Sequence, residues 1–188
     1  MGLQWQWQAN YKTSWFSLAT KKGALRLYSQ VLPDGAANLW WAPNLLLQKF
    51  PAPEFIVTTK TTFHPKILNE KSGLIIMGLD YAYLALKKSH GGLSLIQASC
   101  SNAEDGSEEF IVEQVIINLR TLYLRAKVEN KALCHFLYSF DGKTFHQIGK
   151  TFQAKSGKWI GAKVGLFAIR PDSLQTGGFA DFDFFRVE

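Results

Sequence analysis

Hydrophobic and polar residues alternate with a period of two along much of this chain, the pattern of a β-strand with one face in a core. A further segment, 111–119, also fits one face of a helix. Its β-branched runs, Ile111-Val112 and Val115-Ile116-Ile117, favour a strand instead, because such side chains lose rotamer freedom in a helix. The alternating segments are residues 55–63, 122–128, 134–140 and 160–168.

Turn-forming residues separate these segments. Asp141-Gly142-Lys143 lies between two strand-like stretches and predicts a hairpin. Residues 102–109 are acidic and contain glycine, so we expect a surface loop. Many short strands at this spacing predict an all-β fold, a two-sheet antiparallel sandwich or jelly roll, as one domain over 1–188. Similar turn signals occur at His90-Gly91-Gly92, Pro33-Asp34-Gly35 and Thr176-Gly177-Gly178.

Composition narrows the class of protein. Hydrophobic residues make up 47% and charged residues 19% of 188 residues, which is typical of a globular chain. No apolar run reaches the ~20 residues of a membrane helix, and no secretory signal pattern opens the chain. The net charge of +6 comes from scattered lysines. We therefore expect neither nucleic acid nor membrane as a partner.

Catalytic motifs are missing from the sequence. The four histidines form no metal-binding spacing, and there is no nucleophile elbow or phosphate-binding loop. Two cysteines cannot form a disulfide framework or a metal cluster by themselves. A glycosidase needs two carboxylates that face the substrate. Residues 104–109 belong to a loop, and Glu54, Glu113 and Glu129 are isolated, although distant carboxylates could converge. We predict no catalytic residue, and no enzymatic activity of this chain alone.

Tryptophans are the other candidates for binding. Exposed indole rings stack on sugars, whereas most tryptophans are largely buried. Trp5 and Trp7 share one strand face and are predicted to pack. Trp40 and Trp41 are adjacent, so in an extended strand they point in opposite directions and only one can enter the core. They are the candidates for carbohydrate stacking, with core or interface roles as the alternative.

Six segments in order resemble one known module, the C-terminal concanavalin A-like domain of family 43 glycoside hydrolases, the β-xylosidase and α-arabinofuranosidase group. The resemblance covers the chain from about Trp5 to Glu188. Two departures are Tyr11, where the family usually has Pro, and Lys49, where it often has Arg. The segments are Trp5-Gln6-Trp7-Gln8-Ala9-Asn10, Gly23-Ala24-Leu25-Arg26-Leu27, Asn44-Leu45-Leu46-Leu47-Gln48-Lys49, Ser72-Gly73-Leu74-Ile75-Ile76, Tyr138-Ser139-Phe140-Asp141-Gly142 and Ala180-Asp181-Phe182-Asp183-Phe184-Phe185-Arg186.

The resemblance implies a concanavalin A-like jelly roll and a non-catalytic accessory domain. In that family the catalytic carboxylates lie on an N-terminal β-propeller, so none is assigned here. Residues 1–188 are then expected to be excised from a longer bacterial enzyme. The implied partners are the catalytic propeller of the parent chain and a xylo- or arabino-oligosaccharide at the domain interface. An autonomous carbohydrate-binding module is the alternative. Periplasmic, secreted and cytoplasmic locations all stay open.

The resemblance also suggests a residue at the substrate rim. In β-xylosidases of this family a loop of the sandwich places an aromatic residue, usually Phe, at the edge of the active site. The stretch 159–166 resembles the sequence at that position, so Trp159 takes the aromatic place, and Lys163 replaces an apolar residue. The polar loop 155–158 could present the ring outward. The alternative is that Trp159 begins the strand as a core anchor.

A calcium site is the last expectation from the resemblance, because related sandwiches often carry a structural calcium beside the last strand. Asp181 and Asp183 lie two residues apart and so on one face of that strand. Calcium needs about six to eight oxygen ligands, which backbone carbonyls and water would have to complete. The alternative is that both aspartates pair with Lys or Arg or bond turn backbone.

Overall fold

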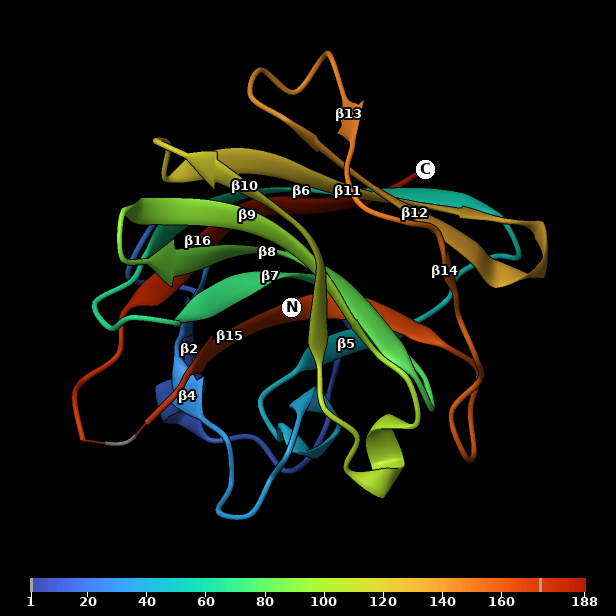
Figure 1. Cartoon of the computed structure of the whole chain (residues 1–188), viewed down its shortest axis with the longest axis horizontal. Coiled ribbons are helices and arrows are strands. Elements are labelled where there is room, and N and C mark those ends of the chain that lie inside the picture. Colours follow the sequence, from blue (N-terminus) through green and yellow to red (C-terminus); the bar gives the residue numbers. More distant parts are fainter. Residues whose placement is uncertain (1, 173) are drawn as a thin grey trace.

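The computed structural model describes residues 2–172 and 174–188 of the chain. Two β-sheets pack face to face, and the all-β sandwich expected from the alternating pattern is confirmed (Figure 1). Four short 3-10 helices are found in connections of the described part: η1 (Thr13–Trp15), η2 (Leu39–Trp41), η3 (Ala103–Asp105) and η4 (Asn130–Ala132).

The first sheet, sheet A, runs in the order β1-β5-β15-β7-β8-β9-β10, and β4 pairs with β15. Its pairs are antiparallel except β4 with β15, which is parallel. Its strands are β1 (Gln6–Trp7), β4 (Gln30–Val31), β5 (Leu46–Lys49), β7 (Lys71–Met77), β8 (Tyr81–Ser89), β9 (Gly92–Cys100), β10 (Phe110–Ile117) and β15 (Lys163–Arg170).

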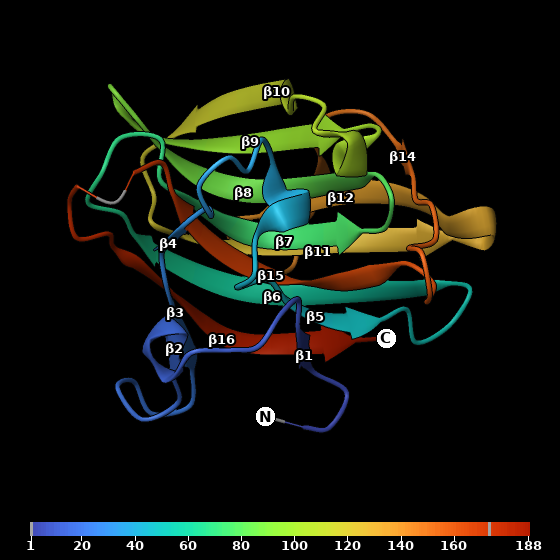
Figure 2. The ribbon, with the colours of Figure 1, turned by 90° about the horizontal axis from the view of Figure 1, so that it is seen from below.

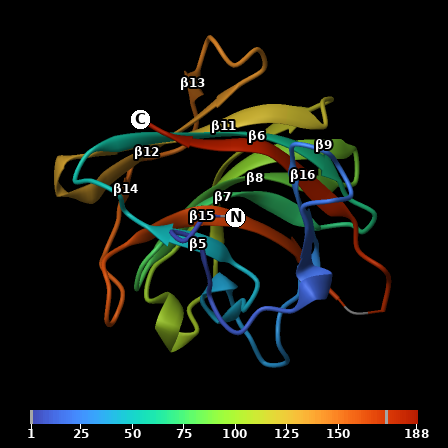
Figure 3. The same ribbon diagram turned by 180° about the vertical axis from the view of Figure 1, so that it is seen from behind.

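The second sheet, sheet B, runs in the order β13-β12-β11-β6-β16-β3-β2, and β14 pairs with β12. Seen from behind, β6 and β16 lie side by side in this layer, whereas β5 and β15 lie in the other (Figure 3). Its strands are β2 (Phe16–Ser17), β3 (Leu25–Tyr28), β6 (Phe55–His64), β11 (Thr121–Glu129), β12 (Leu133–Ser139), β13 (His146–Gln147), β14 (Phe152–Gln153) and β16 (Phe179–Val187).

The main core fills the space between the two sheets. Along β11 every second residue is buried, because one face of the strand packs on the core and the other faces solvent, and successive side chains point to opposite faces. The buried set includes Leu122, Leu124 and Ala126. The predicted strand at 111–119 is also confirmed as β10, which forms the edge of sheet A. Trp5 and Trp7 pack against this core, as expected.

A second apolar cluster covers the outer face of sheet A, the face turned away from sheet B. The cluster includes Tyr83 and Phe167 in the sheet, with Leu39 of η2 and Ala103 next to it. Viewed from below, the two short helices η2 and η3 lie over β7, β8 and β9 (Figure 2). Because both faces are covered, β7 and β8 consist of nearly continuous buried residues and show little alternation.

The Asp141-Gly142 hairpin is confirmed by the antiparallel pairing of β12 with β13. Gly142 has φ of 75°, a left-handed conformation that glycine adopts without strain. The Asp141 carboxylate accepts hydrogen bonds from the backbone N–H groups of Lys143 and Thr144, which fixes the turn. This excursion stands out from the layer of sheet B (Figure 1).

Candidate functional site

Trp159 lies on the loop between β14 and β15, and the residue is 93% exposed. Alternation from Ile160 onward predicted a strand there, but β15 begins at Lys163. The reason is that both neighbours, β5 and β7, end opposite this residue, at Lys49 and Met77. The earlier residues therefore have no strand on either side to pair with. The hypothesis that Trp159 anchors the core at the start of a strand is wrong.

Four polar contacts hold the Trp159 loop, residues 155–162, against the rest of the domain, one of them the hydrogen bond from the Phe50 backbone N–H to the Ala162 carbonyl at 3.1 Å. Lys155 Nζ lies 2.7 Å from Oδ2 of Asp80, whose side chain is only 7% exposed. The backbone N–H of Leu79 donates to the Ser156 carbonyl at 3.3 Å. Lys158 forms an ion pair with Glu104 of η3. The base of the loop is therefore fixed while Trp159 projects from it.

Gly78 lets the loop approach this closely. A Cβ at this position would collide with the carbonyl oxygen of Lys155. Gly78 follows β7 directly, and the backbone of the Trp159 loop occupies the space in which a side chain would stand. Only glycine permits such an approach without moving one of the two backbones.

A hollow of ≈250 Å³ lies beside Trp159, and we call it the Trp159 hollow. Its lining includes Trp40, Met77, Ile160 and Lys163. Burial, and then the charge of Lys49, lowers the pKa of Lys163 below its usual value. Two indole rings beside apolar side chains and the two lysines, Lys158 and Lys163, form a surface that suits a sugar ring or an apolar side chain of a partner.

Trp40 and Trp41 are not in a strand, so the expectation of opposite strand faces is wrong. They belong to η2, which begins at the Asn38 cap, where the side-chain oxygen accepts from Trp40 N at 2.9 Å. Trp40 is half-buried against the outer cluster and also lines the Trp159 hollow. Trp41 is 51% exposed and does not line that hollow. The structure thus brings together Trp40 and Trp159 but not Trp41.

Asp181 and Asp183 both face cations. Arg26 holds both oxygens of Asp181, with Nε at 2.7 Å from Oδ1 and Nη2 at 3.0 Å from Oδ2. Asp183 accepts from Lys21 at 2.8 Å and pairs with Lys60 at 2.9 Å. Partial burial raises the pKa of Asp183, but the hydrogen bonds from the two lysines outweigh it and keep that pKa low.

This arrangement does not fit a calcium ion. The two carboxylates already face three positive side chains, and a divalent cation there would meet repulsion rather than free ligands. Within residues 2–172 and 174–188, no group of three or more His, Cys, Asp or Glu side chains is placed to hold a metal. The ion-pair alternative describes the geometry of Asp181 and Asp183.

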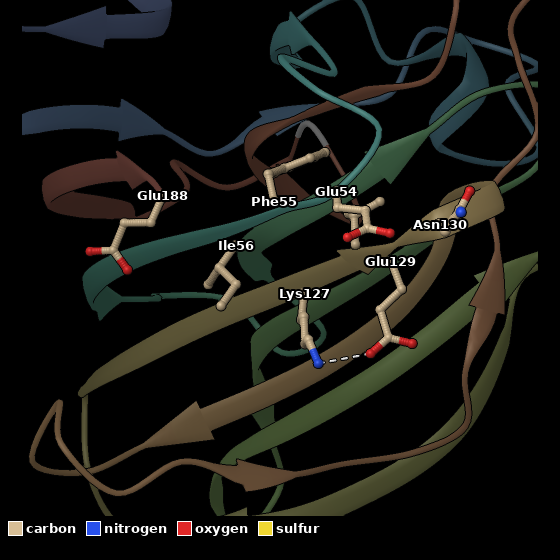
Figure 4. A pocket seen from close by; sticks show the side chains of 8 residues that line it. Glu54, Phe55, Ile56, Lys127, Glu129, Asn130 and Glu188 are labelled. Atoms are coloured by element: carbon tan, nitrogen blue, oxygen red, sulfur yellow. Dashed lines mark ion pairs between the residues drawn. The ribbon is translucent and has the colours of Figure 1, made fainter.

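A second hollow gathers carboxylates, as Figure 4 shows, with Glu54, Glu129 and Glu188 among its lining residues. Hydrogen bonds from Lys127 and then from His135 lower the pKa of Glu129. A glycosidase acid needs the opposite shift, because it must hold a proton near neutral pH. The geometry therefore brings two of the isolated glutamates, Glu54 and Glu129, to one hollow without giving Glu129 the property of a general acid.

A polar network on the outer face of sheet A has no recognisable motif in the sequence. The carboxylate of Glu109 accepts from Tyr81 Oη at 2.9 Å, from Tyr83 Oη at 2.6 Å and from Lys71 Nζ. Burial and the charge of Glu109 raise the pKa of both tyrosines, so both stay protonated donors. The loop 102–109 was expected to be solvated, and no short-range pattern indicates that its last residue folds onto the sheet.

The two cysteines are buried inside the domain. Cys100 and Cys134 are buried free thiols. Burial raises the pKa of Cys134 to about 12, which keeps the thiol protonated.

Within the part of the chain that the structure describes, every helix is too short or too polar to span a lipid bilayer.

Comparisons with known proteins agree with this geometry. Residues 1–188 match the family described as the β-xylosidase C-terminal concanavalin A-like domain. A β-xylosidase from Formosa agariphila is 29% identical over 212 residues, a match that covers 100% of this chain and 33% of the relative. The chain therefore spans about a third of the length of this curated relative.

Two solved structures contain a closely similar fold. A bifunctional GH43-CE protein from Bacteroides eggerthii aligns with a TM-score of 0.86 and 25% identity, over 100% of this chain and 24% of that chain. The GH43 protein BlXynB from Bacillus licheniformis aligns with a TM-score of 0.82 and 24% identity, over 100% of this chain and 37% of that chain. With the fold, the ordered motifs and an end-to-end family match in agreement, this chain belongs to the family of β-xylosidase C-terminal concanavalin A-like domains of GH43 glycoside hydrolases.

Proposed function

We propose that this chain is the non-catalytic accessory domain of a larger glycoside hydrolase of the β-xylosidase type. In this proposal the Trp159 loop packs on the catalytic domain, and its indole ring narrows the mouth of the sugar pocket. The implied partners are the catalytic propeller of the parent chain and a xylo- or arabino-oligosaccharide at the domain interface.

The observation that carries the proposal is the exposure of Trp159. The residue is 93% exposed on a loop that Lys155 and Lys158 hold against the domain. A large apolar ring on a fixed support costs free energy in water, and burial of that ring against a partner or a sugar recovers it. The length of the relatives supports the same idea, because two thirds of the Formosa agariphila protein lies outside the match.

A ring at the pocket rim would act through binding rather than bond making. It would exclude water from the pocket and stack on a terminal sugar, while the acid and base chemistry would come from the catalytic domain. The surrounding Trp159 hollow, with Trp40 and Ile160 in its wall, offers apolar surface for the contact with that domain.

The test compares two exposed tryptophans in the full-length parent enzyme. We expect Trp159→Ala to lower kcat/KM on a xylo-oligosaccharide about tenfold, the loss of ~1.4 kcal/mol of contact. Trp41→Ala is the matched control, because Trp41 is 51% exposed and lies outside the hollow. Equal kcat/KM values for wild type and Trp159→Ala would reject the rim role.

An autonomous carbohydrate-binding module is the second candidate, and the exposure of Trp41 beside η2 favours it. The 188-residue chain would then bind xylo-oligosaccharides by itself, and Trp41→Ala or Trp40→Ala would weaken that binding. Calorimetric titration of the chain with xylotetraose distinguishes the two. Binding that is lost in Trp41→Ala supports the module, whereas no heat of binding supports the accessory role.

A further inference from the structure

Strand β10 forms a long, free edge of sheet A. It has eight residues and pairs with β9 on one side. Figure 2 shows it at the edge of the sheet opposite to β1. In the part of the chain that the structure describes, the other edge strands, β1, β2, β13 and β14, have two residues each. Short edge strands are a common way to prevent pairing with another chain, and β10 departs from it.

Apolar side chains are exposed along the β10 edge. Phe110 is 56% exposed and Ile116 is 74% exposed. Residues 110–119 contain no Lys, Arg or Pro, and their one charged residue is Glu113. The Glu113 carboxylate accepts from the backbone N–H of Gly149 at 2.7 Å, so its own chain holds it. The charges and prolines that usually protect an edge strand are therefore missing from β10.

A β-bulge limits the part of β10 that can pair. The register with β9 shifts between Ile111 and Glu113, and such a bulge bends the strand and interrupts a ladder. The regular part of the edge is thus 113–117. Val115 packs against the main core, so the next residue, Ile116, points to the outer face of sheet A.

We propose that the β10 edge pairs with the β10 edge of a second copy of this chain, antiparallel about a two-fold axis at Val115. Gln114 then lies opposite Ile116 of the second copy. The two Ile116 residues become diagonal neighbours with Cα atoms about 7–8 Å apart, close enough for their side chains to touch. An axis at Glu113 would instead place two like charges directly opposite each other, which destabilises a sheet.

The charges at the two ends of the edge favour a second copy as the occupant. Glu108 precedes β10, whereas Arg120 follows it, with Lys88 beside Arg120 in the lining of one hollow. Antiparallel pairing brings the acidic start of one copy toward the cationic end of the other. Within residues 2–172 and 174–188, no ion pair involves Glu108 or Arg120.

The charge within the paired part does not oppose this arrangement. With the axis at Val115, the two Glu113 residues are offset by four residues along the strands, or about 14 Å. This separation exceeds the Debye length of about 8 Å at physiological salt, so their repulsion is screened. The β10 edge and the Trp159 hollow share no residue, and the pairing does not depend on the proposed accessory role.

The experiment is sedimentation equilibrium of the 188-residue chain between about 1 µM and 1 mM, because small interfaces associate weakly. We expect a monomer–dimer equilibrium. Ile116→Lys should weaken dimerisation at least tenfold, because a charge on an edge strand opposes pairing. Its far-UV circular dichroism should be unchanged, since Ile116 is largely exposed. Leu18→Lys is the matched control, with the same substitution at an exposed leucine outside β10, and should dimerise like the wild type.

Disulfide trapping tests the register. Opposite residues in an antiparallel pair have Cα atoms about 4.5–5.5 Å apart, within the range that a disulfide spans, whereas diagonal ones are too distant. In an oxidised mixture of Gln114→Cys and Ile116→Cys chains, we therefore expect the mixed disulfide to exceed either like-with-like disulfide. The native Cys100 and Cys134 are buried and do not compete.

Three results would overturn the proposal. A chain that stays monomeric at every concentration would leave the β10 edge to a strand of another protein. Unchanged dimerisation in Ile116→Lys would place the contact elsewhere on the surface. A mixture without the mixed disulfide would reject the two-fold axis at Val115.

Discussion

Asp80 and Lys155 form an ion pair of 2.7 Å that joins the turn between β7 and β8 to the loop carrying Trp159. The second oxygen of Asp80 accepts from the backbone N–H of Asn102 at 2.8 Å. One buried carboxylate thus holds two loops that are far apart in the sequence, and the position of the exposed indole depends on it.

Loss of this ion pair should mobilise Trp159. We expect Lys155→Met to lower the free energy of unfolding by about 1 kcal/mol, because Lys155 is half exposed and water screens the pair. The larger effect should be a lower order parameter of the Trp159 indole N–H in ¹⁵N relaxation. Lys143→Met serves as the control. An unchanged order parameter in Lys155→Met would show that other contacts hold the loop.

Two tryptophans of opposite exposure should respond differently to truncation. Trp159 is 93% exposed and Trp15 is 5% exposed. We expect Trp159→Ala to change the free energy of unfolding in urea by no more than about 0.5 kcal/mol. Trp15→Ala should lose about 3–5 kcal/mol, the usual cost of deleting a buried aromatic ring. A loss of several kcal/mol in Trp159→Ala would mean that the ring is packed in solution.

Chelation should leave the domain unaffected. Asp181 and Asp183 face Arg26, Lys21 and Lys60, so we expect the same Tm with and without EDTA. Differential scanning calorimetry measures this directly. A Tm that falls with EDTA and recovers with added calcium would disprove the ion-pair description of these aspartates.

Acid should weaken the hairpin at Asp141. Hydrogen bonds from the backbone N–H groups of Lys143 and Thr144 lower the pKa of Asp141 from 3.8 to about 2. Because the folded pKa is below the unfolded one, the stabilisation is present above pH 3.8 and is lost as the pH falls towards 2. Carboxyl ¹³C NMR should report the low pKa.

Asp141→Asn is the control for that titration, because it keeps a side-chain acceptor but carries no titrating group. We expect a smaller loss of stability between pH 4 and pH 2 in this variant than in the wild type. Identical pH dependence of the two proteins would assign the acid response to other carboxylates.

Strands β6, β11 and β12 of sheet B could be predicted from the sequence, because each of them has a more buried and a more open face. The alternation at 55–63 and 122–128 corresponds to β6 and β11. The strands β7 and β8 lack this signal because η2 and η3 cover their second face. Local residues cannot indicate which distant loop will cover a strand.

The site was less accessible to sequence analysis, for two physical reasons. The alternation that includes Ile160 continues beyond the strand, and the strand starts only where β5 and β7 provide partners at Lys163. The position of β10 at the edge of sheet A depends on strand order, which the sequence does not display. The polar, turn-like loop before Trp159 allowed an exposed ring, but the sequence left a core anchor equally open, and the structure places the residue 93% exposed.

The close approach at Gly78 makes the Trp159 loop an exchangeable cassette. The first end of the loop is fixed by the ion pair of Lys155 with Asp80, and the second end is fixed where β15 begins. Gly161 has open space where a Cβ would stand, so this end tolerates substitution. Loops of different length and aromatic content could be grafted between residues 156 and 162 while Gly78, Asp80 and Lys155 are kept, which would vary the aromatic contact without redesign of the sandwich.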